Sequence, residues 1–286
     1  MKSKSLNHSA LAVVGTCLAV FAGQAAAQSA GNGASGTGGW NDWDFYLGAG
    51  VAYAPEYEGS DKQETSAFPA FEAVWRDTLV VSGKGIGAFV YDRNGLRVSA
   101  ALGYGGGREE SDSVHLRGLG DIDDGAVVSL GAQLDLAPRV TATADVNTFL
   151  KGSKGTVVSL GLQSQVPFGV VRGALSPTGN RYDDVAGQQG LALIGGVSID
   201  WANDNYNQSF FGVSAAQSSS SGLRQYSAGS GLKSVNAEIG FSQTLGDNWG
   251  LTGIVQYSRL LGDAKDSPVV KSEGNYAAVL AIGYRF

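Results

Sequence analysis

The chain has 286 residues, with 20 lysines and arginines against 26 aspartates and glutamates, a formal net charge of −6. This balance excludes a strongly basic surface for nucleic acid. After the N-terminal region, no stretch approaches the roughly 18 consecutive apolar residues of a membrane-spanning helix, which excludes a helical membrane protein. Forty-three glycines against six prolines favour short strands and tight turns. In a helix each glycine costs about 1 kcal/mol relative to alanine.

Residues 1–27 have the pattern of a secretory signal peptide. Lys2 and Lys4 form a basic start, residues 10–22 form an apolar run, and Ala25-Ala26-Ala27 supplies a cleavage site of small residues. The only cysteine, Cys17, lies inside the apolar run. The mature chain is therefore expected to have no disulfide, no thiol catalysis and no thiolate metal site.

Two further segments follow the expected cleavage site. Residues 28–41 consist mostly of Gly, Ser, Ala and Asn, a composition that cannot bury enough surface to fold, so they are expected to form a flexible leader. Residues 42–286 are expected to form one outer-membrane β-barrel.

Alternating apolar residues predict the strands. Residues 43–53 are apolar at every second position, and Trp43 and Tyr53 near the ends match the aromatic girdles of a lipid-facing strand. The same pattern recurs along the chain and predicts an all-β fold, a transmembrane antiparallel up-and-down barrel of about 12 strands, with 10 to 12 possible. The expected strands are residues 43–53, 67–75, 79–91, 96–104, 128–136, 140–149, 156–166, 170–176, 191–201, 235–241, 249–257 and 276–286.

The connections between these strands are of two kinds. Short turns rich in Gly, Pro, Asn and Asp are expected at residues 92–95, 137–139, 167–169 and 246–248. Long connections are expected at residues 55–65, 105–124, 177–189, 202–231 and 262–275. With twelve strands in this register, residues 105–124 and 177–189 fall on the side where barrels usually have short turns. Either a weak strand is miscounted or the barrel has long loops at both ends.

The final strand carries the expected outer-membrane assembly signal. Its apolar face is formed by Tyr276, Ala278, Leu280, Ile282, Tyr284 and Phe286, and its length matches a tilted membrane-crossing strand. A last strand that ends on an aromatic residue resembles the segment that the barrel assembly machinery recognises in bacterial outer-membrane barrels. Tyr276, Leu280, Ile282, Tyr284 and Phe286 are therefore predicted to direct the chain into outer-membrane lipid, and the strand is expected to pair with residues 43–53 and close the ring.

A soluble β-sandwich is the alternative fold, because its strands also have one apolar and one polar face. The positions of the aromatic residues favour the barrel. Aromatic residues lie at or near the strand ends, whereas a sandwich buries its bulky residues in the middle of its strands. They are Trp43, Tyr53, Tyr104, Trp201, Trp249, Tyr257, Tyr276 and Phe286.

Several stretches resemble the MipA/OmpV family of outer-membrane proteins, named for interaction with the lytic transglycosylase MltA. They are Pro55-Glu56-Tyr57-Glu58-Gly59-Ser60-Asp61, Arg117-Gly118-Leu119-Gly120-Asp121-Ile122-Asp123, Phe211-Gly212-Val213-Ser214, residues 257–270 and Gly283-Tyr284-Arg285-Phe286. The resemblance implies a barrel that is not an enzyme and has no cofactor. It also implies a scaffold that links a murein hydrolase, the lytic transglycosylase, to a bifunctional penicillin-binding protein that synthesises murein.

Few residues offer chemistry. His115 is the only histidine after the signal peptide, and a hydrolase built on it is the weakest hypothesis, because nothing aims a nucleophile at it. The acidic residues around it match no known calcium-loop spacing, so a solvated acidic loop is preferred to a metal site. These are Glu109, Glu110, Asp112, Asp121, Asp123 and Asp124.

Polar residues alternate with the apolar ones and are expected to line the lumen. They include Ser129, Gln133, Thr143, Asp145, Asn147, Ser159 and Gln163. A twelve-stranded ring is wider than the side-chain-filled rings of eight strands and narrower than the open rings of sixteen. A passive small-solute channel is therefore the alternative function, unless long loops such as residues 202–231 close the lumen.

Overall fold

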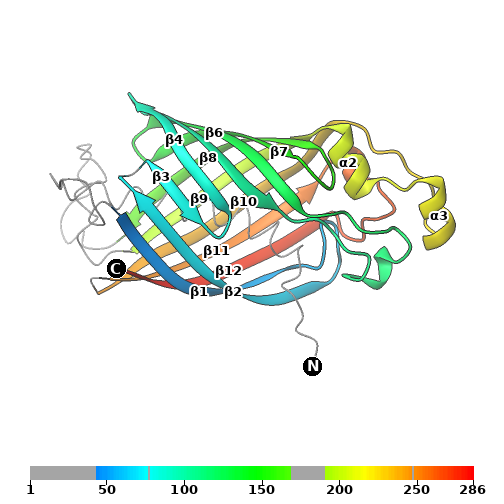
Figure 1. The fold of residues 1–286 in the computed structure, drawn as a ribbon, viewed down its shortest axis with the longest axis horizontal. Coiled ribbons are helices and arrows are strands. Elements are labelled where there is room, and N and C mark those ends of the chain that lie inside the picture. The colour runs from blue at the N-terminus through cyan, green and yellow to red at the C-terminus, as the bar shows by residue number, and fades with distance from the viewer. Residues whose placement is uncertain (1–42, 77, 169–190, 247) are drawn as a thin grey trace.

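The protein is described by a computed structural model, which places residues 43–76, 78–168, 191–246 and 248–286. The expected signal peptide and leader, residues 1–27 and 28–41, lie outside the described residues. The described chain forms one closed antiparallel ring of twelve strands (Figure 1), so the barrel prediction is confirmed and the sandwich is wrong. The strands are β1 (Trp43–Pro55), β2 (Gln63–Trp75), β3 (Leu79–Ser82), β4 (Gly85–Arg93), β5 (Leu96–Gly105), β6 (Gly125–Ala137), β7 (Val140–Phe149), β8 (Thr156–Phe168), β9 (Leu191–Ala202), β10 (Gly231–Leu245), β11 (Trp249–Leu260) and β12 (Gly274–Arg285).

The ring closes between β1 and β12, as predicted. Tyr46 pairs with Arg285 at one end of the seam and Tyr53 pairs with Ala278 at the other. The Arg285 guanidinium also donates to Asp44 Oδ1, with Nη2 at 2.6 Å, so an ion pair joins the two strands beside their ladder. Closure leaves no sheet edge at this seam, which a sheet in lipid requires.

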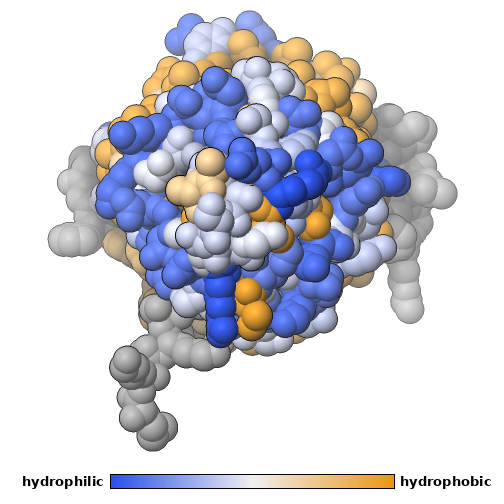
Figure 2. Space-filling model, turned by 90° about the vertical axis from the view of Figure 1, so that its right-hand side faces the viewer, coloured by the Kyte–Doolittle hydropathy of each residue, from blue (hydrophilic) through white to orange (hydrophobic). Residues whose placement is uncertain are grey.

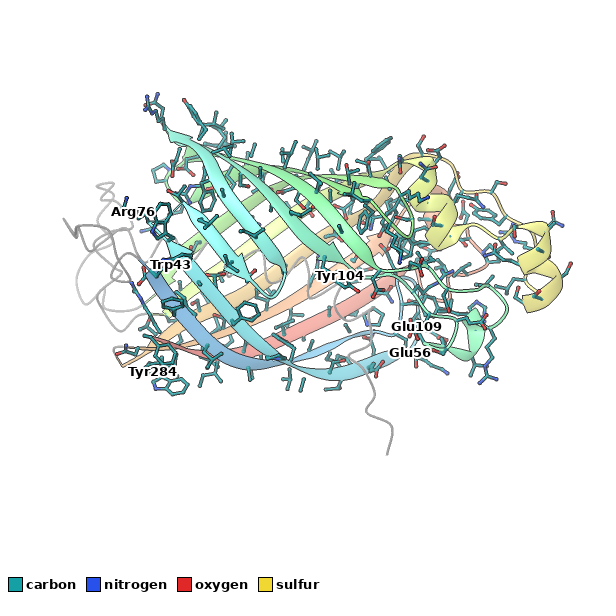
Figure 3. All side chains as sticks on the ribbon, viewed as in Figure 1. Trp43, Glu56, Arg76, Tyr104, Glu109 and Tyr284 are labelled. Atoms are coloured by element: carbon teal, nitrogen blue, oxygen red, sulfur yellow. The ribbon has the colours of Figure 1, made fainter. Side chains whose placement is uncertain are left out.

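Alternation places apolar side chains outside and polar ones inside. The outward residues Leu130 and Ile239 have 54% and 67% of their surface exposed, whereas Ser129 faces the lumen and its hydroxyl donates to Asn147 across the β6–β7 pair. Trp43 and Tyr284 lie together at one end of the barrel, at the position of an interfacial aromatic girdle (Figure 3). The outer surface therefore suits lipid contact.

Residues 79–91 form two strands, so their prediction as one strand is wrong. The chain reverses at residues 83–84, and Ser82 pairs with Gly85 in a short β3–β4 hairpin. Gly85 has a φ of +141°, and a Cβ there would collide with the Leu102 carbonyl oxygen on β5. Glycine is thus required by both conformation and close backbone approach, and continuous apolar alternation conceals the reversal.

The added strand changes the side on which the loops lie. The connection at residues 106–124 now falls at the same end as those at 56–62, 150–155, 203–230 and 261–273, so its assignment to the short-turn side is wrong. The expected strand 170–176 and the expected loop 177–189 lie outside the described residues. The expected turn at 167–169 is also wrong, because β8 continues to Phe168 and pairs there with Leu191.

The long connections contain the helices of the described chain, which the glycine content did not predict. They are η2 (Val114–Leu116), α2 (Asp204–Phe211), α3 (Ala215–Ser221) and α4 (Gly262–Lys265). Asn203 caps α2, and Ser214 with Gln217 forms a capping box on α3, so the starts of these two helices are specified locally. Among the described helices, none is both long enough and apolar enough to cross a membrane.

The predicted assembly residues form the lipid-facing side of β12. Tyr276 and Phe286 are 60% and 69% exposed, and the Tyr284 ring lies edge-on to the rings of Trp249 and Phe286 at 5.2 and 5.0 Å. The side chains of Leu280 and Ile282 are also exposed on this face.

We expect Phe286→Ala to lower the fraction of protein inserted in the outer membrane, because it removes an aromatic residue from the face on which recognition of the last strand is proposed to depend. The measurement is the folded fraction in isolated outer membranes, read from heat-dependent gel mobility. Phe45→Ala is the control, since Phe45 is a lipid-exposed aromatic residue on β1. Equal insertion of both variants would contradict the prediction.

Candidate functional site

The five long connections pack together at one end of the barrel and form a single structure, which we call the loop cap. It comprises residues 56–62, 106–124, 150–155, 203–230 and 261–273. In Figure 1 it lies beyond the strands at the right-hand end, with α2 and α3 on it. Glu56 and Glu109 lie at this end, opposite Trp43, Arg76 and Tyr284 (Figure 3).

The loop cap has its own apolar core. Tyr57, Leu116, Leu119, Val213 and Val269 are at most 3% exposed and pack on one another. They come from four different connections. Burying an apolar side chain of this size contributes about 1.5–3 kcal/mol to the free energy of folding. Packing in this core is therefore a main source of the stability of the loop cap.

Four of these core residues come from the stretches that carry the family resemblance. Tyr57, Leu119, Val213 and Val269 each belong to a different quoted stretch. Burial, followed by the nearby Asp61 carboxylate, raises the pKa of Tyr57 far above its ordinary value, while its hydroxyl donates to the Val269 carbonyl at 3.2 Å. The motifs thus specify how the loops pack together.

Polar side chains join the loops by donating hydrogen bonds to backbone carbonyls of neighbouring loops. Arg108 Nη1 donates to the Phe210 carbonyl at 2.6 Å, Gln217 Nε2 to that of Leu119 at 2.6 Å, and Ser267 Oγ to that of Phe211 at 2.5 Å. Burial lowers the pKa of the Arg108 guanidinium to about 10. These bonds satisfy carbonyls that would otherwise be buried without a donor.

A second apolar cluster seats the loop cap on the barrel rim. Tyr206 and Phe211 of α2 pack with Ala264 of α4 against the outer ends of the strands, where they meet Val157 and Leu260. The Tyr206 ring also lies 5.5 Å from that of Phe149 at the end of β7. The cap is therefore continuous with the barrel.

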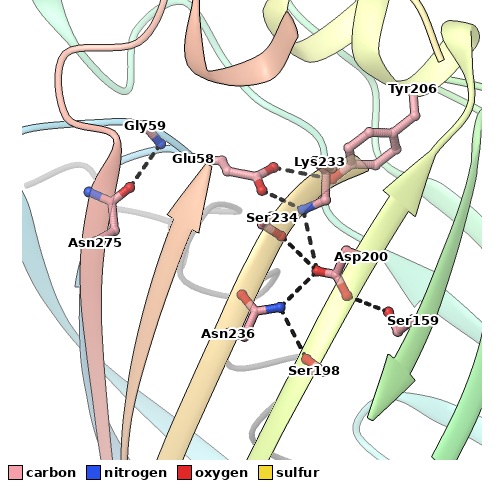
Figure 4. Close-up of polar contacts among 10 residues, drawn as sticks. All are labelled: Glu58, Gly59, Ser159, Ser198, Asp200, Tyr206, Lys233, Ser234, Asn236 and Asn275. Atoms are coloured by element: carbon pink, nitrogen blue, oxygen red, sulfur yellow. Dashed lines mark hydrogen bonds and ion pairs between the residues drawn. The ribbon is translucent and has the colours of Figure 1, made fainter. Parts of the chain in front are cut away.

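Beneath the loop cap lies a buried charge cluster (Figure 4). Lys233 on β10 is 8% exposed, and its Nζ lies 2.5 Å from Glu58 Oε1 and 3.7 Å from Asp200 Oδ2. Glu58 comes from the β1–β2 connection and Asp200 from β9, so the ammonium joins the cap to the wall. The Tyr206 hydroxyl donates to Glu58 Oε2 at 3.4 Å, which adds α2 to the network.

Hydroxyl and amide donors from the wall hold the Asp200 carboxylate. Ser159 Oγ donates to Oδ1 at 2.7 Å, and Ser234 Oγ and Asn236 Nδ2 donate to Oδ2 at 2.9 and 3.0 Å. A carboxylate with this many donors is fixed in place, and together with Glu58 it compensates the cost of burying Lys233. The charges of the cluster are paired with one another, which favours a structural role. The cluster attaches the loop cap to the barrel wall, and we call it the Lys233 latch.

His115 and the acidic loop serve the same packing. His115 Nε2 lies 3.0 Å from the Pro268 carbonyl oxygen, where a ring N–H donates, and the Ser111 hydroxyl donates to Glu109. Glu110 Oε2 accepts from the backbone N–H groups of Gly118 and Gly120.

The other acidic side chains fit the same pattern. Asp112 and Asp121 accept from the N–H groups of residues 109 and 110, and Asp124 accepts from Gly107 and from the Tyr104 hydroxyl. Among the described residues, no group of three or more acidic, histidine or cysteine side chains is arranged to hold a metal. Most of these acidic residues thus bond backbone N–H groups of the loop, whereas the Asp123 carboxylate lies 3.4 Å from Lys151 Nζ in an exposed ion pair.

The sequence interpretation missed the charge cluster. Glu58 lies in a quoted stretch, but Lys233 precedes the expected strand 235–241 and Asp200 resembles other polar lumen residues. The cluster could have been suspected from the charged residues at strand ends whose side chains alternate to the inward face. Their partners are separated by up to 175 residues, so the pairing itself depends on the closed ring.

The end of the loop cap is mostly hydrophilic and is surrounded by a hydrophobic ring, which is the outward face of the strands seen end-on (Figure 2). An apolar band around a polar-lined ring, with the described connections long at one end and short at the other, is the architecture of an outer-membrane β-barrel. This one has a packed cap over one mouth.

The chain belongs to the MipA family. The family model described as MltA-interacting protein MipA matches residues 47–286. The MltA-interacting protein of Escherichia coli (strain K12) is 31% identical over 97 residues, which cover 34% of this chain and 39% of that protein. Outer membrane protein Omp26La of Vibrio anguillarum is 26% identical over 208 residues, which cover 66% of this chain and 78% of that protein.

Solved outer-membrane structures show weaker likeness. The N-terminal barrel domain of Pseudomonas aeruginosa OprF has 12% identity, covers 67% of this chain and 96% of that one, and gives a TM-score of 0.25. A bacterial polysaccharide outer membrane secretin has 10% identity, covers 87% and 100%, and gives a TM-score of 0.38.

We expect Lys233→Met to loosen the loop cap, because it leaves the Glu58 and Asp200 carboxylates facing each other with no cation. Removing one partner of a buried ion pair costs on the order of 3 kcal/mol. The measurement is the rate of subtilisin cleavage within the cap loops of the folded barrel. Lys62→Met, which removes an exposed lysine close to Glu58 in sequence, is the control and should leave the rate unchanged. Equal rates for both variants would show that the cluster is no latch.

Proposed function

We propose that this protein is an outer-membrane scaffold for murein remodelling, which holds a lytic transglycosylase of the MltA kind close to a bifunctional penicillin-binding protein. Membership of a family described as MltA-interacting, over residues 47–286, is the observation that carries the proposal. The family is named for an interaction and not for a reaction. We also infer that the chain has no catalytic activity of its own, which is consistent with the structural bonds made by His115.

We infer that the two ends of the barrel face different compartments. Outer-membrane barrels have short turns on the periplasmic side and longer loops outside. By this rule the loop cap, where five of the longer connections meet, faces outward. The end with the turns at residues 94–95 and 138–139, where the connection 169–190 also falls, faces the periplasm. Murein enzymes act in the periplasm, so the proposed partners meet the turn end.

The turn end displays arginines. Arg93 and Arg139 have exposed side chains beside two of its turns, while Arg97 and Arg285 are paired with Asp92 and Asp44. Exposed guanidinium groups favour association with an acidic surface and fix its orientation more than they add affinity. We propose this arginine rim as part of the partner contact.

We expect the double variant Arg93→Glu with Arg139→Glu to retain less lytic transglycosylase than the wild type at physiological salt, because charge reversal opposes an acidic partner. The measurement is capture of the purified transglycosylase and the penicillin-binding protein by folded barrel. The matched control reverses two exposed cap charges, Arg117→Glu with Lys271→Glu, and should bind like the wild type.

Two results would count against these proposals. Equal capture by both double variants would remove the arginine rim as the contact. Failure of the wild-type barrel to capture either enzyme would remove the scaffold itself.

A small-solute channel is the second candidate, and the polar side of the lumen favours it. The inner wall carries polar side chains, as the wall of a water-filled passage does. They include two hydrogen-bonded pairs, Ser129 with Asn147 and Ser159 with Asp200. The loop cap opposes it, because Lys233 and Tyr206 are buried where the passage would leave the barrel.

We expect wild-type barrel in planar bilayers to conduct weakly and Lys233→Met to conduct more, because the variant loosens the loop cap over the mouth. Single-channel current at fixed voltage is the measurement, with Lys62→Met as the control. Folded protein that stays silent in both wild-type and Lys233→Met forms would remove the channel.

A further inference from the structure

Two adjacent seams of the ring, one on each side of β3, are much shorter than the others. β2 has 13 residues, but only its last four, Glu72 to Trp75, pair with β3. The two seams made by β3 have four paired positions each, whereas every other seam has at least eight. In Figure 1 the β3–β4 hairpin ends partway along the barrel, while β2 continues to the cap end.

The short hairpin leaves part of β2 with a strand on one side only. Residues 65–71 pair with β1, but no described strand pairs with them on the other side. Pro69 lies in this run, and proline is confined to strand positions whose N–H is not needed in a ladder. Thr65 is opposite Tyr53, an exposed aromatic residue near the cap end of the barrel.

This run therefore crosses the half of the apolar band nearer the loop cap. Backbone groups without partners are costly in lipid, so a lipid-exposed sheet edge needs to be shielded.

The inner side of this run carries an apolar patch around Phe68, and the polar residues Glu64, Ser66 and Glu72 lie on the same face of the strand. Phe68, in the middle of the run, turns inward, and its ring lies 2.5 Å from where a Cβ would stand on Gly50. It packs on Ala52, Ile254 and Val279, which are at most 4% exposed. Only a glycine at position 50 leaves room for the ring.

The outer rim of the gap is also apolar. Phe71 on β2 and Ile86 on β4 are 48% and 45% exposed, and a Cβ on Gly83 at the hairpin tip would lie 3.7 Å from the Phe71 ring. Leu102 and Tyr104 on β5 are 51% and 56% exposed. The lipid-facing band is thus continuous, through the gap, with the Phe68 patch inside.

We propose that this gap is a lateral portal, and that the hydrocarbon chain of a lipid in the cap-side leaflet inserts through it onto Phe68. A hydrocarbon chain is apolar, like the exposed rim residues and the inner patch around Phe68, and this match is the reason for choosing it as the occupant. With the loop cap outward, this leaflet is the outer one. The portal gives the lumen a route into the membrane that bypasses the closed mouth.

The test replaces Phe68 with the photoreactive residue p-benzoylphenylalanine in full-length protein in outer membranes. The same residue at Leu130, which faces lipid, is the positive control. At Gln163, which faces the lumen from a strand paired on both sides, it is the negative control. We expect lipid adducts, identified by mass, at positions 68 and 130 and none at 163. Lipid adducts at position 130 alone would overturn the portal. A crosslinked product at position 68 with twice the protein mass would also overturn it, because it would show that a second copy of the chain contacts this edge.

A second variant closes the gap. Two residues inserted on each side of Gly83-Lys84 would lengthen β3 and β4 along β2. We expect the adduct at position 68 to be lost while the adduct at 130 persists. Continued labelling at 68 in this variant, with folding confirmed by gel mobility, would show that the lipid reaches Phe68 by another path and would overturn the proposal.

Discussion

The structure depends on one constraint, which is that a sheet in lipid must pair its backbone groups within itself. Pairing of β1 with β12 satisfies it by closing the ring, and the Arg285–Asp44 ion pair lies at the same seam. Closure then determines the rest of the architecture. Side chains alternate between lipid and lumen, and every connection except the β3–β4 turn falls at one of two ends.

The two ends of the barrel differ in the length and packing of their connections. At the turn end, short connections reverse the chain and leave arginines exposed. At the other end, five longer connections meet, and each alone is too short to bury a core. Residues separated by as many as 212 positions, such as Tyr57 and Val269, therefore pack together. The Lys233 cluster links this core to the wall because its three charges come from a loop and two strands.

The sequence predicted what depends on local pattern. Alternation revealed eleven of the strand regions, and the apolar face of residues 276–286 indicated where the ring closes. It did not show the reversal at residues 83–84, because β3 and β4 continue the same alternation and only the conformation of Gly85 marks the turn. The cap core and the Lys233 latch were not predictable, since the contacts that define them form only once the ring has brought distant loops together.

The residues that identify the family and the residues that meet a periplasmic partner therefore need not be the same. Tyr57, Leu119, Val213 and Val269 are buried in the loop cap, and Glu58 is held by Lys233. Their physical role is to close one mouth of the barrel. In the proposed orientation a murein enzyme in the periplasm would meet the opposite end, where the only quoted stretch is Gly283-Tyr284-Arg285-Phe286 at the end of the last strand. The cap motifs thus account for how the loops pack over this mouth, and on the proposed function the choice of partner would depend on the turn end, which these motifs leave largely unspecified.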